Sequence, residues 1–403
     1  MKGPKIPIGI RSLAVGFPSV LRTNDYWRTR YPGMIAEAEK YSLAKLWSKA
    51  EKPDAFDASA AAYLGDPFRG AVERRLRAPG ETALSMELRA ARGALEAASL
   101  GPDDIDLTIV TSFVGDRLGT GNAIYLAKEL GLRTPAWNYE TACSGSLVGL
   151  HTAASLIRSG DYRRVLVVVS TSNSVQVTDV DTLGWFVGDG AGAFIVERVP
   201  DGYGLLGWKT INSLETIDMF VIQSVTTPQG GTRFCTAAHP EANRIARDTA
   251  QPYLKTTVEG ALTMADMTMK DVDYWVFNTP NAWYADFCAQ TLGVEKGRYH
   301  SMYTTYGNIG AALMPTTLYH DLHDGRIKPG HVVGMYSIGS TSTSSALVLR
   351  AGDIALGPYP TKPTTKDEVA ISSIAIAPPT GDRQRVLDAA TAPSQTADTR
   401  QGE

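Results

Sequence analysis

The residue best placed for covalent chemistry is Cys143. It lies in AWNYETACSGSLVGL, residues 136–150, between a predicted strand and a predicted helix, with small residues directly after it. A thiol at a helix N-terminus faces free backbone N–H groups and the positive end of the helix dipole, which stabilise thiolate and lower the thiol pKa. The position predicts a nucleophile. The competing interpretation is a buried cysteine packed as a small hydrophobe.

The other two cysteines lack this setting. Cys235 lies in GGTRFCTAAH and Cys288 lies in the helical NAWYADFCAQTL, and we expect both to be structural. Three widely separated cysteines without a CxxC pair argue against a disulfide framework and against a zinc site. They favour a reducing, cytoplasmic location, and no metal site is expected.

Composition narrows the classes of partner. The 403 residues are 43% hydrophobic and 20% charged, as in an ordinary globular protein. With 39 Lys and Arg against 42 Asp and Glu, the net charge of −3 gives no electrostatic reason to expect nucleic acid or an anionic membrane as partner. No window approaches eighteen uninterrupted apolar residues, and the N-terminus does not resemble a signal peptide. A small-molecule or protein-borne substrate is the better expectation.

An internal repeat indicates which elements position the cysteine. GALEAASLGPDDIDLTIV, residues 93–110, is echoed by GALTMADMTMKDVDYWVF, residues 260–277, so that Asp106 and Asp273 stand 167 positions apart. A second pair of helix, glycine stop and strand places Gly160 and Gly325 165 positions apart. Continuously apolar strands such as VLVVV are typical of sheets covered by helices on both faces. The pattern predicts a duplicated α/β unit. The alternative is that it reflects only the alternation of helices and strands found in any α/β protein.

Several motifs together resemble one family. ETACSGSLVGL is similar to the active-site segment of the β-ketoacyl-acyl carrier protein synthase III group, in the thiolase-like superfamily. GWFVGDGAGAFIVE, residues 184–197, and YGNIGAALMP, residues 306–315, resemble further motifs of that family in the same order. The resemblance covers about residues 8–350. It implies an α/β, duplicated thiolase-like fold with five layers, α-β-α-β-α, and a homodimer.

The resemblance also implies a mechanism. Cys143 would take an acyl group from a coenzyme A or acyl carrier protein thioester and pass it to a second substrate. Asn308 stands at the position of the family's catalytic asparagine, whose amide donates to a developing oxyanion; the alternative is an Asx-turn residue that follows Tyr306 and Gly307. Gly339, in the loop YSIGSTSTSS, would supply a backbone N–H to the oxyanion hole, although the usual glycine run is thinned there. No cofactor beyond the thioester substrate is implied.

One departure from the family pattern carries functional weight. The family's His-Gln-Ala-Asn stretch reads Asn-Thr-Pro-Asn here, with Asn278 at the histidine and Asn281 retained at the last position as a substrate-binding residue. Asparagine donates hydrogen bonds but is not a useful general base, so the amides of Asn278 and Asn308 are both expected to donate to an oxyanion without moving a proton. Two candidates for a replacement base are His239, which is left open, and Asp116. The resemblance implies that the loop of Asp116 crosses to the pocket of the other protomer; the alternative is a solvated loop aspartate.

The lost histidine shapes the functional hypotheses. The first is a Cys-dependent acyltransferase that passes the acyl group to a small-molecule alcohol or amine acceptor, in natural-product biosynthesis of the polyketide type. The second is a decarboxylative β-ketoacyl synthase that forms a C–C bond. The third is a non-catalytic homologue that partners a synthase.

The domain prediction follows the repeat. Residues 1–200 form a first half with a divergent insertion at about 20–85, residues 201–351 form a second half, and residues 352–403 form an extension with a disordered tail. In the insertion, Arg74 and Arg75 are candidates to receive the phosphates of the substrate or an acidic carrier protein, against the alternative of a solvated helix face.

Overall fold

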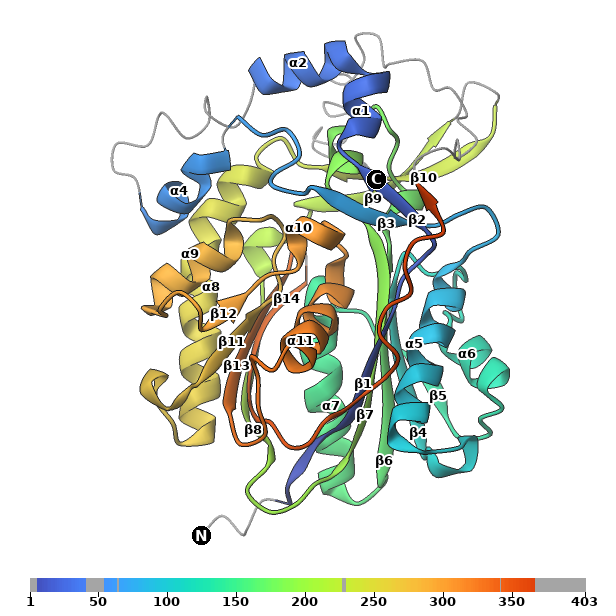
Figure 1. The fold of residues 1–403 in the computed structure, drawn as a ribbon, viewed down its shortest axis with the longest axis vertical. Coiled ribbons are helices and arrows are strands. Elements are labelled where there is room, and N and C mark those ends of the chain that lie inside the picture. Colours follow the sequence, from blue (N-terminus) through green and yellow to red (C-terminus); the bar gives the residue numbers. More distant parts are fainter. Residues whose placement is uncertain (1–5, 41–53, 64, 227–229, 341, 367–403) are drawn as a thin grey trace, which may run out of the picture.

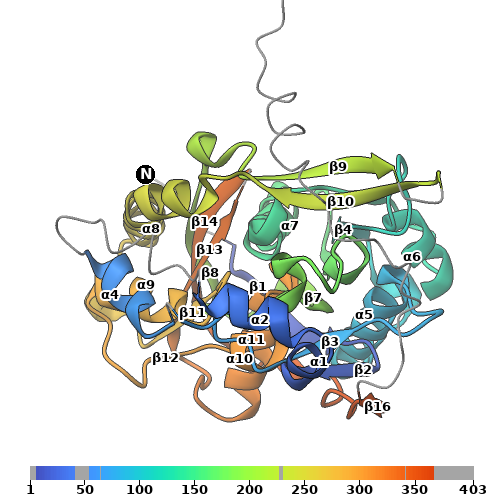
Figure 2. The ribbon, with the colours of Figure 1, turned by 90° about the horizontal axis from the view of Figure 1, so that it is seen from above.

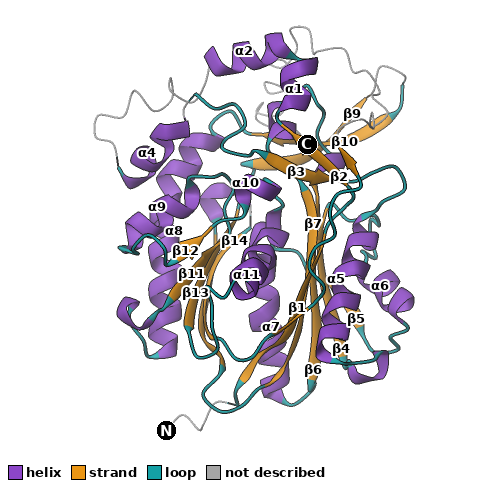
Figure 3. Ribbon diagram, in the orientation of Figure 1, coloured by secondary structure: helices purple, strands orange, loops and turns teal. Residues whose placement is uncertain are grey.

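The computed structural model describes residues 6–40, 54–63, 65–226, 230–340 and 342–366. Two mixed sheets run side by side through the molecule, and helices lie between them and on both outer sides (Figures 1 and 3). Most of the predicted tail, residues 367–403, and part of the predicted insertion, residues 41–53 and 64, lie outside the described residues.

The first sheet has six strands in the order β15-β1-β7-β6-β4-β5. Its strands are β1 (Ile8–Gly16), β4 (Leu107–Phe113), β5 (Ala136–Asn138), β6 (Arg164–Ser172), β7 (Asp189–Arg198) and β15 (Ala355–Leu356). β6 and β7 are buried along nearly their whole length, which explains why their sequences are continuously apolar rather than alternating.

The second sheet has five strands in the order β12-β11-β13-β14-β8. Its strands are β8 (Gly204–Asn212), β11 (Tyr274–Phe277), β12 (Tyr299–His300), β13 (Val332–Gly339) and β14 (Thr343–Arg350). The order β8-β14-β13-β11-β12 repeats β1-β7-β6-β4-β5, and each corresponding pair of strands has the same parallel or antiparallel sense. The predicted duplicated fold is confirmed.

The two aspartates of the sequence repeat do the same structural work. A carboxylate oxygen of Asp106 accepts hydrogen bonds from the backbone N–H groups of Arg163 and Arg164, where β6 begins. The carboxylate of Asp273 accepts a hydrogen bond of 2.7 Å from the N–H of Val332, where β13 begins. Each aspartate therefore aligns the start of the neighbouring parallel strand.

Helices complete five layers. The central layer holds α7 (Gly145–Ser159) and α11 (Leu313–His323), which contact both sheets. The outer layers hold α5 (Ala83–Ala98) and α6 (Ala123–Leu130) on the first sheet, and α8 (Ala242–Ala265) and α9 (Tyr284–Leu292) on the second. Gly160 ends α7 with a φ of 91°, the left-handed conformation that glycine adopts most readily.

The remaining elements gather at one end of the two sheets, at the top of Figure 1, and Figure 2 shows them from above. β2 (Val20–Thr23), β3 (Glu73–Leu76) and β16 (Thr365–Lys366) form a three-stranded sheet, and β9 (Phe220–Thr226) pairs with β10 (Thr232–Ala238) as a hairpin. The short helices are α1 (Asp25–Arg30), α2 (Pro32–Lys40), α4 (Ala55–Ala60) and α10 (Tyr303–Tyr306).

The described part of the C-terminal extension returns to the first half. β15 pairs in parallel with β1, and the N–H of Gly357 donates a 2.9 Å hydrogen bond to the carbonyl of Leu13. The hydroxyl of Tyr319 in α11 donates to the carbonyl of Gly357 at 2.7 Å. Within the described residues, no helix combines the length and apolar character that crossing a bilayer requires.

Candidate active site

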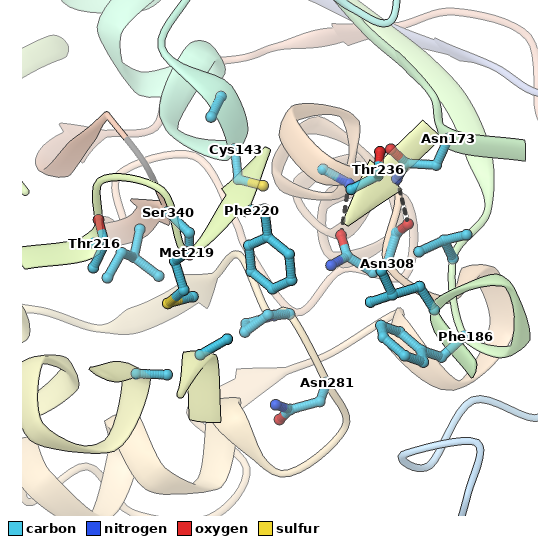
Figure 4. A pocket seen from close by; sticks show the side chains of 18 of the residues that line it. Cys143, Asn173, Phe186, Thr216, Met219, Phe220, Thr236, Asn281, Asn308 and Ser340 are labelled. Carbon is cyan, nitrogen blue, oxygen red and sulfur yellow. Dashed lines mark hydrogen bonds between the residues drawn. The ribbon is translucent and has the colours of Figure 1, made fainter. Parts of the chain in front are cut away.

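Cys143 lies on a strained turn at the start of α7. The preceding residue, Ala142, has a φ of 51°, a conformation that costs about 1–2 kcal/mol for a residue with a side chain. The carboxylate of Glu140 stabilises this turn, because it accepts 2.6 Å and 3.1 Å hydrogen bonds from the N–H of Ala142 and the hydroxyl of Thr111. The turn directs the sulfur away from the helix (Figure 4). Sequence reasoning missed Glu140, although an acid three residues before the cysteine was its visible signal.

A cavity of about 360 Å³ opens in front of Cys143. Most of the side chains that line it are apolar, and they come from both halves and from the β9–β10 hairpin. They include Phe113, Leu183, Phe186, Met219, Phe220 and Trp283. Such a lining suits an acyl chain, because burying methylene groups against it removes them from water.

The charge state of the thiol differs from the sequence prediction. Burial, together with the negative charge of Glu140, raises the pKa of Cys143 to about 12, against the helix N-terminus that was expected to lower it. The expectation that the helix N-terminus lowers this pKa is wrong, because desolvation of the sulfur and the charge of Glu140 outweigh it. Cys143 as a whole is half-buried, since it lines the cavity. The raised pKa favours the neutral thiol form of Cys143 near neutral pH.

Asn278 lies at the junction of the two halves. Its side-chain nitrogen donates hydrogen bonds of 2.9 Å to the carbonyl of Cys143 and 2.9 Å to the carbonyl of Gly310. A primary amide has two N–H hydrogens, and both are used. The expectation that this amide donates to a substrate oxyanion is therefore corrected: Asn278 reaches the cavity but acts as a bridge between the cysteine turn and the segment that carries Asn308.

Asn308 is held differently. Its side-chain oxygen accepts a 2.9 Å hydrogen bond from the N–H of Gly310, and its backbone carbonyl accepts one from the side chain of Asn173 (Figure 4). The side-chain nitrogen remains as a donor toward the cavity, which Asn308 lines. The site thus offers one amide donor, Asn308, where the sequence predicted two.

Gly339 contacts the cysteine turn at the end of β13. A Cβ added there would lie 2.4 Å from the carbonyl oxygen of Thr141 and 3.0 Å from the backbone nitrogen of Ser144. Its neighbours Ile338 and Ser340 line the cavity. The structure therefore brings Gly339 next to the turn.

Asn281 also lines the cavity, and its side-chain oxygen has no hydrogen-bond partner among the described residues. Neither candidate base lines the Cys143 cavity of its own chain. The carboxylate of Asp116 accepts hydrogen bonds from the N–H groups of Ala83 and Leu84 at the start of α5, and His239 does not line the cavity.

The predicted role of Arg74 and Arg75 is wrong. Both lie on the strand β3 rather than on a helix face, with exposed fractions of 0% and 6%. Arg74 donates to the side chain of Asn24 at 2.8 Å, and Arg75 donates to the carbonyls of Pro18 and Thr361 at 3.0 Å and 2.8 Å. These guanidinium groups hold the N-terminal segment together, so they are not available to a phosphate group.

The cavity contains no conventional base. Among its described lining residues there is no histidine, aspartate or glutamate, and the titratable groups are Cys143, Tyr284 and Arg69. Burial raises the pKa of Tyr284 well above its usual value. No cluster of three or more potential metal ligands occurs in the described part of the chain. Arg69 was missed because its segment matches the family pattern least well.

Comparisons with known proteins agree with this geometry. The family model for 3-oxoacyl-[acyl-carrier-protein] synthase III matches residues 138–213, and the model for its C-terminal part matches residues 262–351. The chain is 30% identical to a β-ketoacyl-[acyl-carrier-protein] synthase III of Desulfitobacterium hafniense, over 70% of this chain and 87% of the relative. It is 30% identical to that of Brucella melitensis, over 85% of this chain and 99% of the relative.

Solved structures of low sequence identity share the fold. The 3-oxoacyl-(acyl carrier protein) synthase III of Pseudomonas aeruginosa has a TM-score of 0.69 at 22% identity, with 86% of this chain and 99% of that chain covered. A variant of Xanthomonas campestris OleA, solved with bound lauric acid and lauroyl-CoA, has a TM-score of 0.67 at 20% identity, with 86% and 100% covered. The segments matched by the family models include Cys143, Asn278 and Asn308, and the chain belongs to the β-ketoacyl-[acyl-carrier-protein] synthase III family.

Proposed function

We propose that this chain is an acyltransferase that moves an acyl group from a coenzyme A or acyl carrier protein thioester to an amine or alcohol acceptor through an acyl-Cys143 intermediate. The family's chemistry is acyl transfer and condensation. The observation that favours acyl transfer over condensation is the position of Asn278. Its two N–H hydrogens are both donated to backbone carbonyls.

The first step forms the acyl-enzyme. The sulfur of Cys143 attacks the thioester carbonyl, a new S–C bond forms, the S–C bond of the donor breaks, and the thiol proton leaves with the donor thiol. The apolar lining holds the acyl chain. The side-chain nitrogen of Asn308 is the amide donor for the oxyanion that develops on the carbonyl.

The second step favours an acceptor that brings its own nucleophile. An unprotonated amine attacks the acyl-enzyme, the C–N bond forms, the S–C bond to Cys143 breaks, and one amine proton returns to the sulfur. An alcohol is a weaker nucleophile and needs a base, which the described lining does not supply. An amide product is therefore favoured over an ester. The proposed place in natural-product biosynthesis rests on analogy, because some synthase III relatives in such pathways make esters or amides.

Decarboxylative condensation is the second candidate. It produces an enolate, whose negative oxygen needs strong donors. Asn308 supports this reaction, but Asn278 does not donate to the enolate in this arrangement because its hydrogens are used. Acyl transfer needs no enolate, which is why the geometry supports it better.

The test is a loading and chase experiment followed by intact-mass spectrometry. Acyl-coenzyme A and acyl carrier protein thioesters of several chain lengths are expected to add one acyl mass to the wild type and none to Cys143→Ala. The loaded enzyme is then offered amines, alcohols and malonyl-coenzyme A. Amide formation supports the proposal, a β-keto product supports the synthase, and the absence of any adduct across the panel contradicts both.

A further inference from the structure

Arg69 differs from Arg22 and Arg75 in the partners of its guanidinium group. Its side chain lines the Cys143 cavity, and among the described residues it makes no hydrogen bond or ion pair. By contrast, Arg75 donates to two backbone carbonyls, and Arg22 pairs with Asp179 at 2.7 Å. The side chain is half-buried and meets no acceptor in the described part of the chain, so its N–H donors are free to bind a group that enters the cavity.

The backbone around Arg69 is built to hold this side chain in place. Arg69 has a φ of 52° and Gly70 a φ of 80°, so two successive residues are left-handed. The carboxylate of Asp66 fixes this turn by accepting hydrogen bonds of 2.9 Å and 2.7 Å from the N–H groups of Phe68 and Gly70. Strained backbone at a non-glycine residue persists where the surrounding structure enforces it, and it is concentrated at ligand sites.

The guanidinium of Arg69 packs on Phe186, which contacts the segment that carries Asn308. Its central carbon lies 4.3 Å from the centroid of the Phe186 ring, and the carbonyl of Phe186 accepts a 2.8 Å hydrogen bond from the N–H of Asn308. The carbonyl of Arg69 accepts a hydrogen bond from Ala282, the neighbour of Asn281. Arg69 is thus one side chain away from the segment that carries Asn308.

The charge and shape of the Arg69 guanidinium indicate that its ligand is a carboxylate. Burial lowers the pKa of the Arg69 guanidinium from its usual value, and the remaining described lining offers it no carboxylate. A planar guanidinium binds a carboxylate through two parallel hydrogen bonds and leaves the stacking face free for an aromatic ring such as Phe186. The phosphates of coenzyme A are separated from its sulfur by the whole pantetheine arm, whereas Arg69 lines the same cavity as Cys143 and packs on Phe186.

We propose that Arg69 binds a carboxylate group of a substrate held in the Cys143 cavity, so that either the transferred acyl group or its acceptor is an acid. This inference rests on the proposed acyl transfer through Cys143. It narrows the substrates to dicarboxylic half-thioesters or to amino and hydroxy acids. The remaining apolar lining holds the hydrocarbon part of the same molecules.

The first experiment measures carboxylate recognition without any natural substrate. Cys143 is alkylated with bromoacetyl-glycine, bromoacetyl-β-alanine and bromoacetyl-γ-aminobutyrate, each beside its matched carboxamide, and adducts are followed by intact mass. Rates are expressed as the carboxylate-to-carboxamide ratio, divided by the same ratio for glutathione. This normalisation removes differences in the reactivity of the thiol itself.

At one spacer length the wild-type ratio is expected to exceed that of glutathione by about tenfold to a hundredfold, as for a charge-assisted hydrogen-bonded pair. Arg69→Gln brings the ratio to that of glutathione, and Arg69→Lys keeps part of it. Arg198→Gln, an exposed arginine at the end of β7, changes the net charge equally and leaves the ratio at the wild-type value. Equal ratios in wild type and Arg69→Gln at every length would overturn the proposal.

A second comparison separates the sources of negative charge. Bromoacetyl-pantetheine and bromoacetyl-coenzyme A differ in their phosphates; if Arg69→Gln slows only the latter, Arg69 serves phosphates and the carboxylate proposal is overturned. Loading with adipoyl- against hexanoyl-coenzyme A, and a chase with β-alanine against propylamine, show whether the acid is the acyl group or the acceptor. If no thioester loads Cys143, the proposed function fails, while the alkylation ratios still decide the role of Arg69.

Discussion

The side-chain nitrogen of Asn278 lies 2.9 Å from the backbone carbonyl oxygen of Cys143, and the hydroxyl of Ser337 donates to the same oxygen at 2.8 Å. Two donors on one carbonyl fix the nucleophile's peptide from the side of the second sheet. The asparagine therefore serves the nucleophile through its backbone. This relationship generates the most direct test of the site.

Replacing Asn278 with aspartate removes both hydrogens and places a carboxylate against the carbonyls of Cys143 and Gly310. We expect Asn278→Asp to lower the free energy of unfolding by roughly 2–4 kcal/mol near neutral pH and to abolish acylation. Urea denaturation and intact-mass loading measure the two effects. Asn281→Asp is the matched control, because Asn281 makes no such contact, and it should cost far less stability. Equal losses in the two variants would show that the bridge contributes nothing.

Asn278→His tests whether the asparagine, which stands in place of the family's histidine, prevents decarboxylation. An imidazole brings an ionisable donor to the same place, so we expect acyl loading of Cys143 to persist and decarboxylation of malonyl-coenzyme A to appear. Release of carbon dioxide and the mass of the thioester product measure this change. If the folded variant loads acyl groups but releases no carbon dioxide from malonyl-coenzyme A, the missing imidazole does not account for the preference for acyl transfer.

The protonated thiol predicts a distinctive pH profile. Since the pKa of Cys143 is raised to about 12, the neutral form dominates throughout the working range. The rate of alkylation by iodoacetamide should therefore climb about tenfold per pH unit from about pH 7 to pH 10 without levelling off. A plateau below pH 9 would show that the helix N-terminus outweighs burial after all.

Glu140→Gln isolates the electrostatic share of that shift. The negative charge of Glu140 raises the pKa of Cys143, so its removal lowers the pKa and increases the thiolate fraction at any pH below it. The glutamine oxygen still accepts the N–H of Ala142, which preserves the turn. The same alkylation series should be faster in this variant at each pH, whereas Glu96→Gln, on the exposed face of α5, should match the wild type.

Gly339→Ala tests how closely the second half supports the nucleophile. The added methyl group would meet the carbonyl of Thr141 at 2.4 Å, so the turn must shift and acylation should fall about a hundredfold. Gly65→Ala is the control, because a Cβ there meets nothing within 4 Å. Loading kinetics and thermal unfolding separate a displaced turn from an unfolded protein. Unchanged loading in folded Gly339→Ala would show that the contact between position 339 and the Thr141 carbonyl does not control the position of Cys143.

The repeat was predictable because it has a local cause. Asp106 and Asp273 each align the start of a neighbouring strand, and such a turn leaves an acid before an apolar run at a fixed place in the chain. Cys143 was predictable for the same kind of reason, because a small-residue turn between a strand and a helix is visible in sequence. Its pKa was not, because burial of the turn depends on elements far away in the sequence.

Residues 20–85 show where sequence reasoning ends. Arg69 and Arg74 are five positions apart in a segment rich in charge, and nothing local distinguishes them. One lines the cavity and the other is fully buried against Trp27, with its guanidinium carbon 4.6 Å from the ring centroid. The difference arises from packing between β3, α1 and the second half, which a single sequence does not encode in any short pattern.

The two sheets have the same strand order, and the residues around Cys143 are divided between the two halves of the chain. This division has a consequence for biosynthesis. The nucleophile comes from the first half, and Asn278, Asn308 and Gly339 come from the second. A chain still emerging from the ribosome with only its first half complete carries the thiol without the groups that surround it. The proposed acyl transfer therefore requires both halves of the chain, because Asn278, Asn308 and Gly339 are made after Cys143.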